Sequence, residues 1–281
     1  MTELYTIQRY LQYERLQELN MTHFDCWASR FGETVTSLEL APEGTGYRAR
    51  TRFAKFFNLP ELMQVFKEVA DIKTADQLNL PTPEVEYHNI VTEPTAHQQA
   101  MVKELSKRAE KVHNGIDAHI DNMLRITSDG RKLGLDQRII NPLLPDDPDS
   151  KVNACIDNVH RIWTDYADTK AAQLIFCDIS TPKSDGSFNI YDDIRQKLVQ
   201  RGIPVEQVRF IHEANSDVQK KELFAKVRSG QVRVLIGSTQ KMRAGTNVQD
   251  RLIALHHLDV PWRPSDVGRI LRTFKIKKNV R

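Results

Sequence analysis

The sequence predicts an α/β protein in which a helical N-terminal region precedes a parallel sheet with helices on both faces. Two observations lead to this prediction. In the second half of the chain, short apolar runs alternate with longer amphipathic stretches, as strands alternate with crossover helices. In the first half, most apolar residues recur at helical spacing. A Pro- and Asp-rich stretch, residues 142–150 (PLLPDDPDS), separates the two patterns, so we expect one domain over residues 1–148 and another over 149–281.

Helices and one β-hairpin are expected in the first domain. Residues 2–19 place apolar side chains at near-helical spacing, and residues 93–112 begin with helix-capping chemistry at Thr95. Two runs near residues 34–53, TVTSLEL and YRARTRF, flank the Gly-containing segment APEGTG and predict the hairpin. Short helices are expected over residues 128–140. Three aromatic residues share one face of a further short helix and are expected in the core: Phe24, Trp27 and Phe31.

Four strands and two helices are expected in the second domain. In chain order these elements cover residues 173–177 (strand), 191–202 (helix), 207–213 (strand), 216–230 (helix), 232–237 (strand) and 251–260 (strand). Ser216 is expected to cap the second helix and Gly230 to end it. Ligands of parallel sheets bind beyond the carboxyl ends of the strands. Six residues come after those ends and are expected on one rim: Asp178, Ser180, Thr181, Ser238, Thr239 and Pro261.

The composition is that of a soluble globular protein, with 40% apolar and 27% charged residues. Neither a membrane-spanning run nor a signal peptide is recognisable, so we expect a cytoplasmic protein with no membrane partner. The three cysteines are too far apart for a disulfide framework or a zinc knuckle and are expected to be buried thiols. His256 and His257 are neighbours in a predicted strand and point to opposite faces, so we expect no metal site there.

Basic residues are concentrated near the end of the chain. Residues 221–281 contain 14 Lys and Arg and four Asp and Glu, a net charge of +10 in a chain whose total is +3. A basic segment on an otherwise acidic chain indicates a polyanionic partner, although a solvated basic face would have the same composition.

Four ordered stretches of the second domain resemble the second RecA-like lobe of superfamily two helicases, specifically the Swi/Snf-like DNA translocases. They are QLIFCDIST (173–181), RFIHEANSDVQKKELFAKVRSG (209–230), VRVLIGSTQKMRAGTNVQD (232–250) and LDVPWRPSDVGRILR (258–272). The resemblance is closest to the branch found in very large phage and mobile-element proteins, where the helicase is joined to an adenine-specific DNA methyltransferase. MTELYTIQRYLQ resembles the helix that comes after the last motif of the first lobe, which makes residues 12–148 the helical region between the lobes.

The resemblance implies arginine fingers in the segment GRILR. In the family, the helix that corresponds to Gly268, Arg269 and Arg272 reaches across the interlobe cleft to an ATP that the first lobe holds. A guanidinium stabilises the charge that builds up on the transferred phosphoryl group, an effect of about 10³–10⁵ in rate. Arg269 and Arg272 are three residues apart, so they share one helix face.

The sequence lacks the other half of an ATPase. We find no G-x-x-x-x-G-K-[ST] phosphate-binding loop and no apolar strand that ends in Asp-Glu to hold a metal ion. The resemblance therefore implies ATP and magnesium only in a complete two-lobe protein. We expect the isolated chain to bind no cofactor of its own and to have no ATPase activity.

Residues 238–249 (STQKMRAGTNVQ) resemble the family motif that couples the nucleotide cleft to the DNA strand. Gly245 and Asn247 are expected to shape its turn at the nucleotide cleft. Contacts with the DNA backbone position a protein without reading sequence. Six residues are expected to make such contacts: Ser180, Thr181, Ser238, Thr239, Lys241 and Arg243.

Two departures from the family pattern leave alternatives open. Arg243 and Ala244 stand where the wider family often has small glycines, and several residues are missing between Asp266 and Gly268. Each residue lost from a helix rotates the rest of that helix by about 100°, so we expect at least one of the two finger arginines to be displaced. The main alternative is a non-catalytic DNA- or protein-binding remnant of a methyltransferase–helicase protein. A methyltransferase fragment is disfavoured because no N-P-P-Y-type motif occurs.

Overall fold

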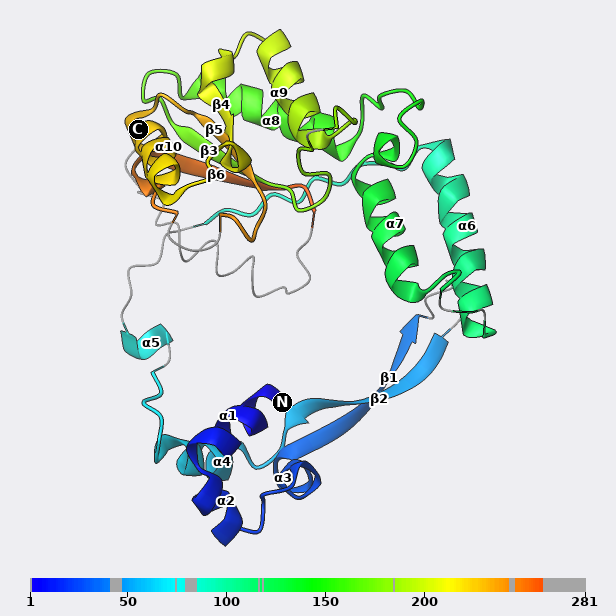
Figure 1. Ribbon diagram of the computed structural model, residues 1–281, viewed down its shortest axis with the longest axis vertical. Helices are drawn as coiled ribbons and strands as arrows, with labels where there is room; N and C mark the ends of the chain where they lie inside the picture. Colours follow the sequence, from blue (N-terminus) through cyan, green and yellow to red (C-terminus); the bar gives the residue numbers. More distant parts are fainter. Residues whose placement is uncertain are drawn as a thin grey trace. The chain divides into compact units, whose positions relative to one another are not determined.

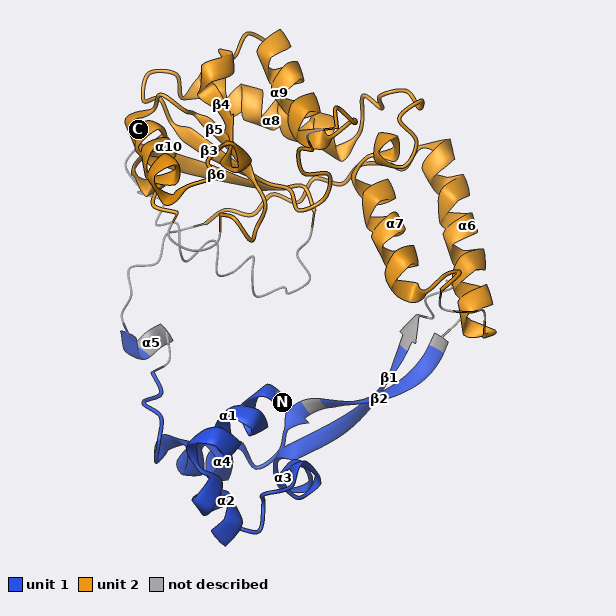
Figure 2. Ribbon diagram, viewed as in Figure 1, with its two compact units in different colours: residues 1–80 blue, residues 81–281 orange. Residues whose placement is uncertain are grey.

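A computed structural model describes residues 2–40, 47–73, 75–78, 85–115, 117, 119–183, 185–242 and 246–259. The chain forms two compact units, Met1–Leu80 and Pro81–Arg281 (Figure 2). The boundary predicted at residues 142–150 lies inside the second unit, where side chains on both sides of it interact, for example Arg138 with Asp193.

The first unit is built on four short helices around an aromatic core. The predicted helix over residues 2–19 is in fact two helices, α1 (Thr2–Leu11) and α2 (Tyr13–Glu18). They are separated at Gln12, whose side-chain amide donates a hydrogen bond to the Val65 carbonyl (2.7 Å). The other two helices are α3 (Phe24–Phe31) and α4 (Leu59–Lys67), and a further turn of helix, α5, spans Ala75–Leu78.

Burial of Trp27 and Phe31 confirms the predicted core face of α3, while Phe24 packs partly buried beside them. The Trp27 indole N–H donates to the Gln8 side chain (2.9 Å), so this buried donor is satisfied.

The predicted hairpin is present and is longer than expected. Strand β1 (Gly32–Leu40) pairs antiparallel with β2 (Tyr47–Phe56). The register places Thr36 opposite Thr51, and their hydroxyl oxygens lie 2.7 Å apart. An irregularity between Glu33 and Thr34 leaves the pairing one residue out of step at the base of the hairpin.

Two long helices open the second unit. Helix α6 (Ala96–His113) begins with the predicted cap at Thr95, whose hydroxyl accepts from the Gln98 amide while the Gln98 side chain accepts from the Thr95 amide. Helix α7 (Met123–Leu135) begins earlier than predicted and continues into a 3₁₀ turn, η1 (Gln137–Ile139). Apolar side chains join α6 to α7, chiefly Leu105, Ala109, Ile126 and Leu133.

A four-stranded parallel sheet forms the rest of the second unit, in the order β4-β5-β3-β6 (Figure 1). Its strands are β3 (Ala172–Phe176), β4 (Val208–Phe210), β5 (Val234–Gly237) and β6 (Leu252–His257). All four predicted strands are present, but the one expected over residues 207–213 is only three residues long and turns into a 3₁₀ helix, η3 (Ile211–Glu213).

Helices cover both faces of this sheet, as predicted. Helices α8 (Lys151–Asp165) and α9 (Ile190–Gln200) pack on one face, and α10 (Asp217–Ser229) packs on the other. Ser216 caps α10, and Gly230 ends it in the left-handed region (φ +79°). A helical region followed by such a sheet confirms the predicted fold class and is consistent with a RecA-like α/β fold; α8 itself was not predicted.

Two of the three thiols are buried as predicted. Burial raises the pKa of Cys155 to about 12 and raises the pKa of Cys177 well above its usual value, so both are neutral. The prediction is wrong for Cys26, which is exposed because α3 turns Trp27 and Phe31 into the core instead.

Candidate functional site

The carboxyl ends of β3, β5 and β6 meet in a hydrogen-bonded rim. The backbone amides of Asp178 and Ile179, just after β3, both donate to the Asp259 carboxylate after β6 (2.9 Å each to Oδ2). The Asp178 carboxylate in turn accepts from the backbone amide of Thr239 after β5 (2.6 Å). Two carboxylates thus tie the three strand ends together, as expected where parallel strands end at one edge of a sheet.

The rim carboxylate of Asp259 is largely buried. Its burial raises the pKa above the ordinary value, and the nearby charge of Asp178 acts in the same direction, while the two backbone amides oppose the shift. Asp259 was not among the predicted site residues, although its position after an apolar run was a usable signal.

Ser180 and Thr181 lie directly beyond β3, as predicted. Ser180 has a positive φ (+60°), which is uncommon for a residue other than glycine. Its hydroxyl oxygen accepts from the amide of Ile190 (3.1 Å), the first residue of α9. The rim is thereby joined to the start of that helix, and the hydroxyl keeps its own proton for another acceptor. Thr181 is half-buried.

Ser238 and Thr239 come after β5 and begin the turn that holds Lys241. The Ser238 hydroxyl oxygen accepts from the Lys241 amide (3.3 Å), and its carbonyl accepts from the Met242 amide (3.0 Å). Thr239 is buried, whereas the side chain of Lys241 is exposed. Asn247 is exposed further along, and its carbonyl accepts from the Arg228 guanidinium (2.5 Å).

The structure therefore brings Asp178, Ser238 and Thr239 together at one rim. The remaining predicted site residues lie outside the described residues: Arg243, Gly245, Gly268, Arg269 and Arg272. The finger geometry and the expected displacement of one arginine stay predictions.

Two arginines of segment 221–281 donate hydrogen bonds to backbone carbonyls within the second unit. Arg233 is 3% exposed and donates to three carbonyls, those of Trp163 (2.7 Å), Tyr166 (3.1 Å) and Ala171 (3.1 Å). Arg251 donates to the carbonyls of Arg228 (3.0 Å) and Thr169. The net charge of this segment therefore overstates the charge that it offers to a partner.

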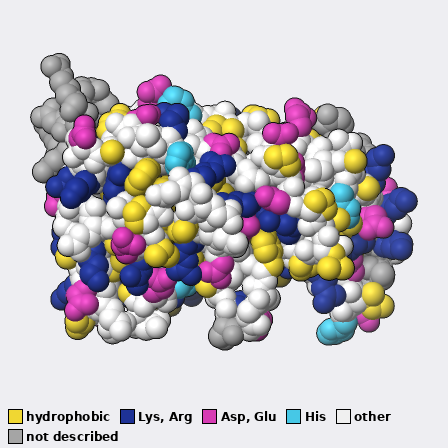
Figure 3. Space-filling view, turned by 90° about the horizontal axis from the view of Figure 1, so that it is seen from above, with side chains coloured by type: hydrophobic (Ala, Val, Ile, Leu, Met, Phe, Trp, Pro, Cys, Tyr) yellow, Lys and Arg dark blue, Asp and Glu magenta, His cyan; other side chains and the backbone are white. Residues whose placement is uncertain are grey.

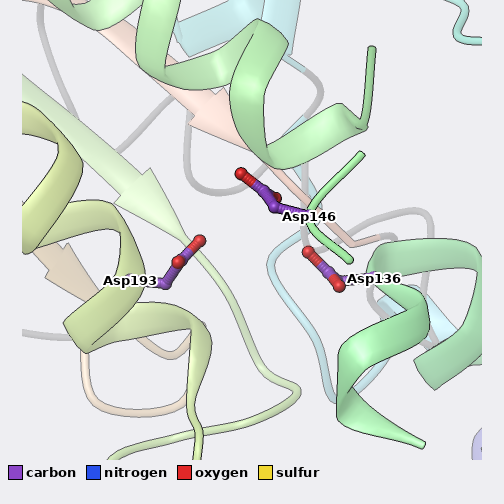
Figure 4. Close-up of side chains that lie close together, drawn as sticks. All are labelled: Asp136, Asp146 and Asp193. Carbon is purple, nitrogen blue, oxygen red and sulfur yellow. The ribbon is translucent and has the colours of Figure 1, made fainter. Parts of the chain in front are cut away.

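An ionic cluster that the sequence did not reveal lies between η1, the 142–150 stretch and α9. Three carboxylates converge there, Asp136, Asp146 and Asp193 (Figure 4). Arg138 binds all three, at 2.7 Å from Asp136 and 2.9 Å from each of the others, and Lys197 binds Asp146 (2.7 Å) and Asp193 (2.9 Å). Two cations thus balance most of the charge of three anions, which makes the cluster an ion-pair network between elements rather than a metal site.

The protonation of the cluster fits this interpretation. Although burial acts against it, the hydrogen bond from Lys197 and the charge of Arg138 hold the pKa of Asp146 below its ordinary value. The carboxylate is therefore ionised at neutral pH and available to both cations.

On the face drawn in Figure 3, Lys and Arg side chains are interspersed with Asp and Glu. That face carries no single large patch of one sign among the described residues, so any basic surface on it is local. In the part of the chain that the structure describes, no helix has both the length and the apolar character needed to cross a bilayer.

Residues 1–74 match the family model of a probable helicase domain, a span that contains α1 to α4 and the β1–β2 hairpin. The match covers about a quarter of the chain and supports a relationship to helicases. No curated protein matches the sequence.

Proposed function

We propose that this chain supplies the second RecA-like lobe of a DNA-dependent ATPase of the Swi/Snf-like helicase type. The observation that carries the proposal is the rim at which Asp178 joins the ends of β3, β5 and β6. This rim belongs to a parallel sheet with helices on both faces, in a chain whose first 74 residues match a probable helicase domain. The relationship to helicases is thus indicated by residues 1–74, and the sheet edge at which ligands usually bind belongs to the second unit.

In this function the rim holds the DNA backbone without reading sequence. The hydroxyls of Ser180 and Ser238 each accept one backbone amide and retain a proton that can be donated to a phosphate oxygen. The exposed ammonium group of Lys241 supplies a charge at the same turn. Thr181, Thr239 and Arg243 complete the proposed set, and Gly245 and Asn247 shape the nucleotide side of the motif.

Hydrolysis of ATP would need a first RecA-like lobe in addition to this chain. A first RecA-like lobe would bind ATP and magnesium, and Arg269 and Arg272 would stabilise the charge on the transferred phosphoryl group, with Gly268 allowing close approach. The chain itself would contribute DNA contacts and guanidinium groups but no phosphate-binding loop.

ATPase assays of the chain with and without a first lobe test the proposal. Alone, with magnesium, ATP and duplex DNA, the chain should turn over less than about 0.1 ATP per second, well below the usual range of enzymes. Mixed with, or fused to, the first lobe of a Swi/Snf-like protein, it should give DNA-stimulated hydrolysis. Replacing Arg269 and Arg272 together with alanine should abolish that activity, while Lys275→Ala, which also removes a basic side chain, should not.

Turnover by the chain alone that persists through purification would contradict the proposal. A two-lobe mixture that binds DNA but never hydrolyses ATP would favour the alternative, a non-catalytic DNA-binding remnant. Binding to DNA that is insensitive to Lys241→Gln would show that the rim does not contact the DNA backbone.

A further inference from the structure

A hollow of about 390 Å³ lies along α1 and the start of α2, within the first unit (Figure 1). Its volume is in the range of about 300–1,000 Å³ that is usual for small-molecule sites. Because residues three and four apart share one side of a helix, a single short stretch of the chain provides the whole lining. The lining side chains are those of Tyr5, Thr6, Arg9, Tyr10 and Tyr13.

Tyr5 forms the inner side of the hollow and is held by the core. It is buried, its hydroxyl donates to the Thr22 carbonyl (2.6 Å), and the centroid of its ring lies 5.7 Å from that of Trp27. These contacts fix α1 against the core of the unit. The role of Tyr5 in the hollow is therefore to support its shape.

Tyr10 and Tyr13 are exposed at the hollow. Tyr10 is 85% exposed, the highest fraction of any aromatic residue that the structure describes, and Tyr13 is 49% exposed. Within the described residues, Tyr10 forms neither a hydrogen bond nor a ring contact. Aromatic rings stack readily on other flat rings, so these two side chains are available to a planar ligand.

Arg9 gives the hollow a positive charge. Its guanidinium lies 5.9 Å from the centroid of the Tyr13 ring, a cation–π contact, and it forms no ion pair among the described residues. No acidic side chain is part of the described lining, since Glu14 lies outside it. The exposed aliphatic residues of α1, Ile7 and Leu11, also lie outside it. This chemistry favours a ligand that combines a flat ring with a negative charge.

An unpaired nucleotide has both features. Every base has a flat face that stacks on an aromatic side chain, and the neighbouring phosphate accepts hydrogen bonds from a guanidinium. Proteins that bind single strands commonly combine aromatic rings with basic side chains in this way. A base inside a duplex is already stacked on its neighbours and has to leave the stack to enter a pocket. The hollow therefore suits a single strand better than a duplex.

We propose that this hollow is a binding site for an unpaired nucleotide of a DNA strand. The rings of Tyr10 and Tyr13 stack on the base, and Arg9 donates to an adjacent phosphate. The hollow lies within residues 1–74, the part of the chain that matches a probable helicase domain, and separation of a duplex exposes unpaired nucleotides. The inference rests on the DNA partner of the proposed function but not on ATP hydrolysis or on the rim.

Fluorescence anisotropy of the full chain at low salt tests the site with two labelled strands of equal length. One strand consists of thymidine nucleotides and the other of abasic nucleotides, so both have the same phosphates and only the first has bases. Tyr10→Ala and Tyr13→Ala should each weaken binding of the thymidine strand by about fivefold to 150-fold, the usual cost of removing a stacking ring. Binding of the abasic strand should stay at the wild-type level.

Two further variants of Tyr10 separate stacking from other effects. Tyr10→Phe keeps the ring and should bind the thymidine strand as the wild type does. Tyr10→Leu keeps an apolar side chain without a flat ring and should lose binding as Tyr10→Ala does. Tyr87→Ala is the matched control, because Tyr87 is 70% exposed and belongs to the second unit, and it should leave binding unchanged.

The charge of Arg9 has its own readout. Arg9→Gln should make the dependence of log affinity on log salt shallower by about 0.7 for both strands, the value for one phosphate contact with a single strand. Far-ultraviolet circular dichroism and the melting temperature, unchanged in all variants, show that the first unit is still folded.

The inference would be overturned by equal affinity of the wild-type chain for the two strands, by wild-type affinity for the thymidine strand in both alanine variants, or by an equal loss for the abasic strand. A loss confined to single-stranded RNA, used in parallel, would also overturn it. The outcome is separable from that of the proposed function. A loss confined to the thymidine strand, with an inactive two-lobe mixture, supports this site alone. An active mixture with unaffected tyrosine variants supports the proposed function alone.

Discussion

The hairpin of the first unit and the sheet of the second unit use arginine in opposite ways. In the sheet domain, Arg233 and Arg251 donate to backbone carbonyls, and Arg233 is buried. In the hairpin, Arg50 is exposed on a face that carries two further arginines. Two arginines from the most basic part of the sequence are therefore engaged by the fold itself. A count of charges along a chain does not locate a binding face.

The C-terminal end of α8 explains why Arg233 is engaged inside the sheet domain. The last carbonyls of α8 have no partners within the helix, and the negative end of the helix dipole lies there. Arg233 reaches this end and donates to the carbonyls of Trp163 and Tyr166, while its guanidinium also lies 5.1 Å from the centroid of the Trp163 ring.

Replacing Arg233 should have the largest effect on stability. Arg233→Met leaves three carbonyls without a charged donor, and each such hydrogen bond is worth about 1.5–3 kcal/mol before non-additivity. We expect the free energy of unfolding of the second unit to fall by roughly 3 kcal/mol or more in urea titrations. Lys221→Met, an exposed basic residue on α10, is the control and should change it little. If both variants lost the same free energy of unfolding, the buried hydrogen bonds of Arg233 would not stabilise the fold.

Mild acid should destabilise the sheet domain through His256. Burial lowers its pKa to about 4, and the charges of His257 and Arg161 act in the same direction. The folded state therefore favours neutral imidazole, so this stability is complete above about pH 6.5 and is lost as the pH falls toward 4. Between pH 7 and pH 5 the expected loss is about 2 kcal/mol.

The hydrogen bond of His256 determines which variant is a suitable control for this prediction. The Gln173 amide nitrogen donates to the Val159 carbonyl, so its oxygen is the acceptor and His256 Nε2 carries the proton (2.9 Å). His256→Gln retains a donor but cannot titrate. Chemical denaturation of both proteins at pH 7 and pH 5 should show a smaller loss in the variant, and an identical loss would remove His256 from the explanation.

The rim carboxylate of Asp178 should give an intermediate effect. Asp178→Ala removes the acceptor of the Thr239 amide, and Thr239 is buried. An unsatisfied buried donor costs about 1–3 kcal/mol, so we expect a loss of about that size in thermal or urea unfolding. Asp178→Asn keeps an acceptor oxygen and should lose less. If both variants match the wild type, the three strand ends are held together without this residue.

Hairpin arginines should have the smallest effect on stability. Arg50→Gln removes an exposed charge with no ion pair among the described residues, and such surface changes usually stay within about 0.5 kcal/mol. The melting temperature should therefore be unchanged. A marked loss of stability would place Arg50 in the structural class of Arg233 and end the contrast between the two regions.

Local chemistry made several elements predictable. Thr95 and Ser216 each precede a glutamine at the third helical position, and both form the complete capping box. Gly230 ends α10 at a φ that other residues rarely adopt, and an added Cβ would lie 2.7 Å from the Cβ of Lys170. These signals depend on a few neighbouring residues, which is why the helices that carry them were located accurately.

Other features depended on residues far apart in the sequence. Gln12 interrupts a helical pattern because its amide reaches Val65, 53 residues away. Helix α8 was not predicted, although the Ser150 hydroxyl caps it by accepting from the Asn153 amide (3.2 Å). The network of Arg138 with Asp136, Asp146 and Asp193 forms only when three separate elements meet.

The sequence by itself determined the order of the four sheet strands with α9 and α10 between them, the parallel sheet with helices on both faces, and the rim that Asp178, Ser238 and Thr239 share. Periodicity, capping and the geometry of parallel strands are enough for these features. Only the tertiary structure decided which charges are free, because a guanidinium looks the same in a sequence whether it faces solvent or a helix end. Arg233 and Arg50 differ in nothing but their surroundings, and those surroundings are made by contacts between distant parts of the chain.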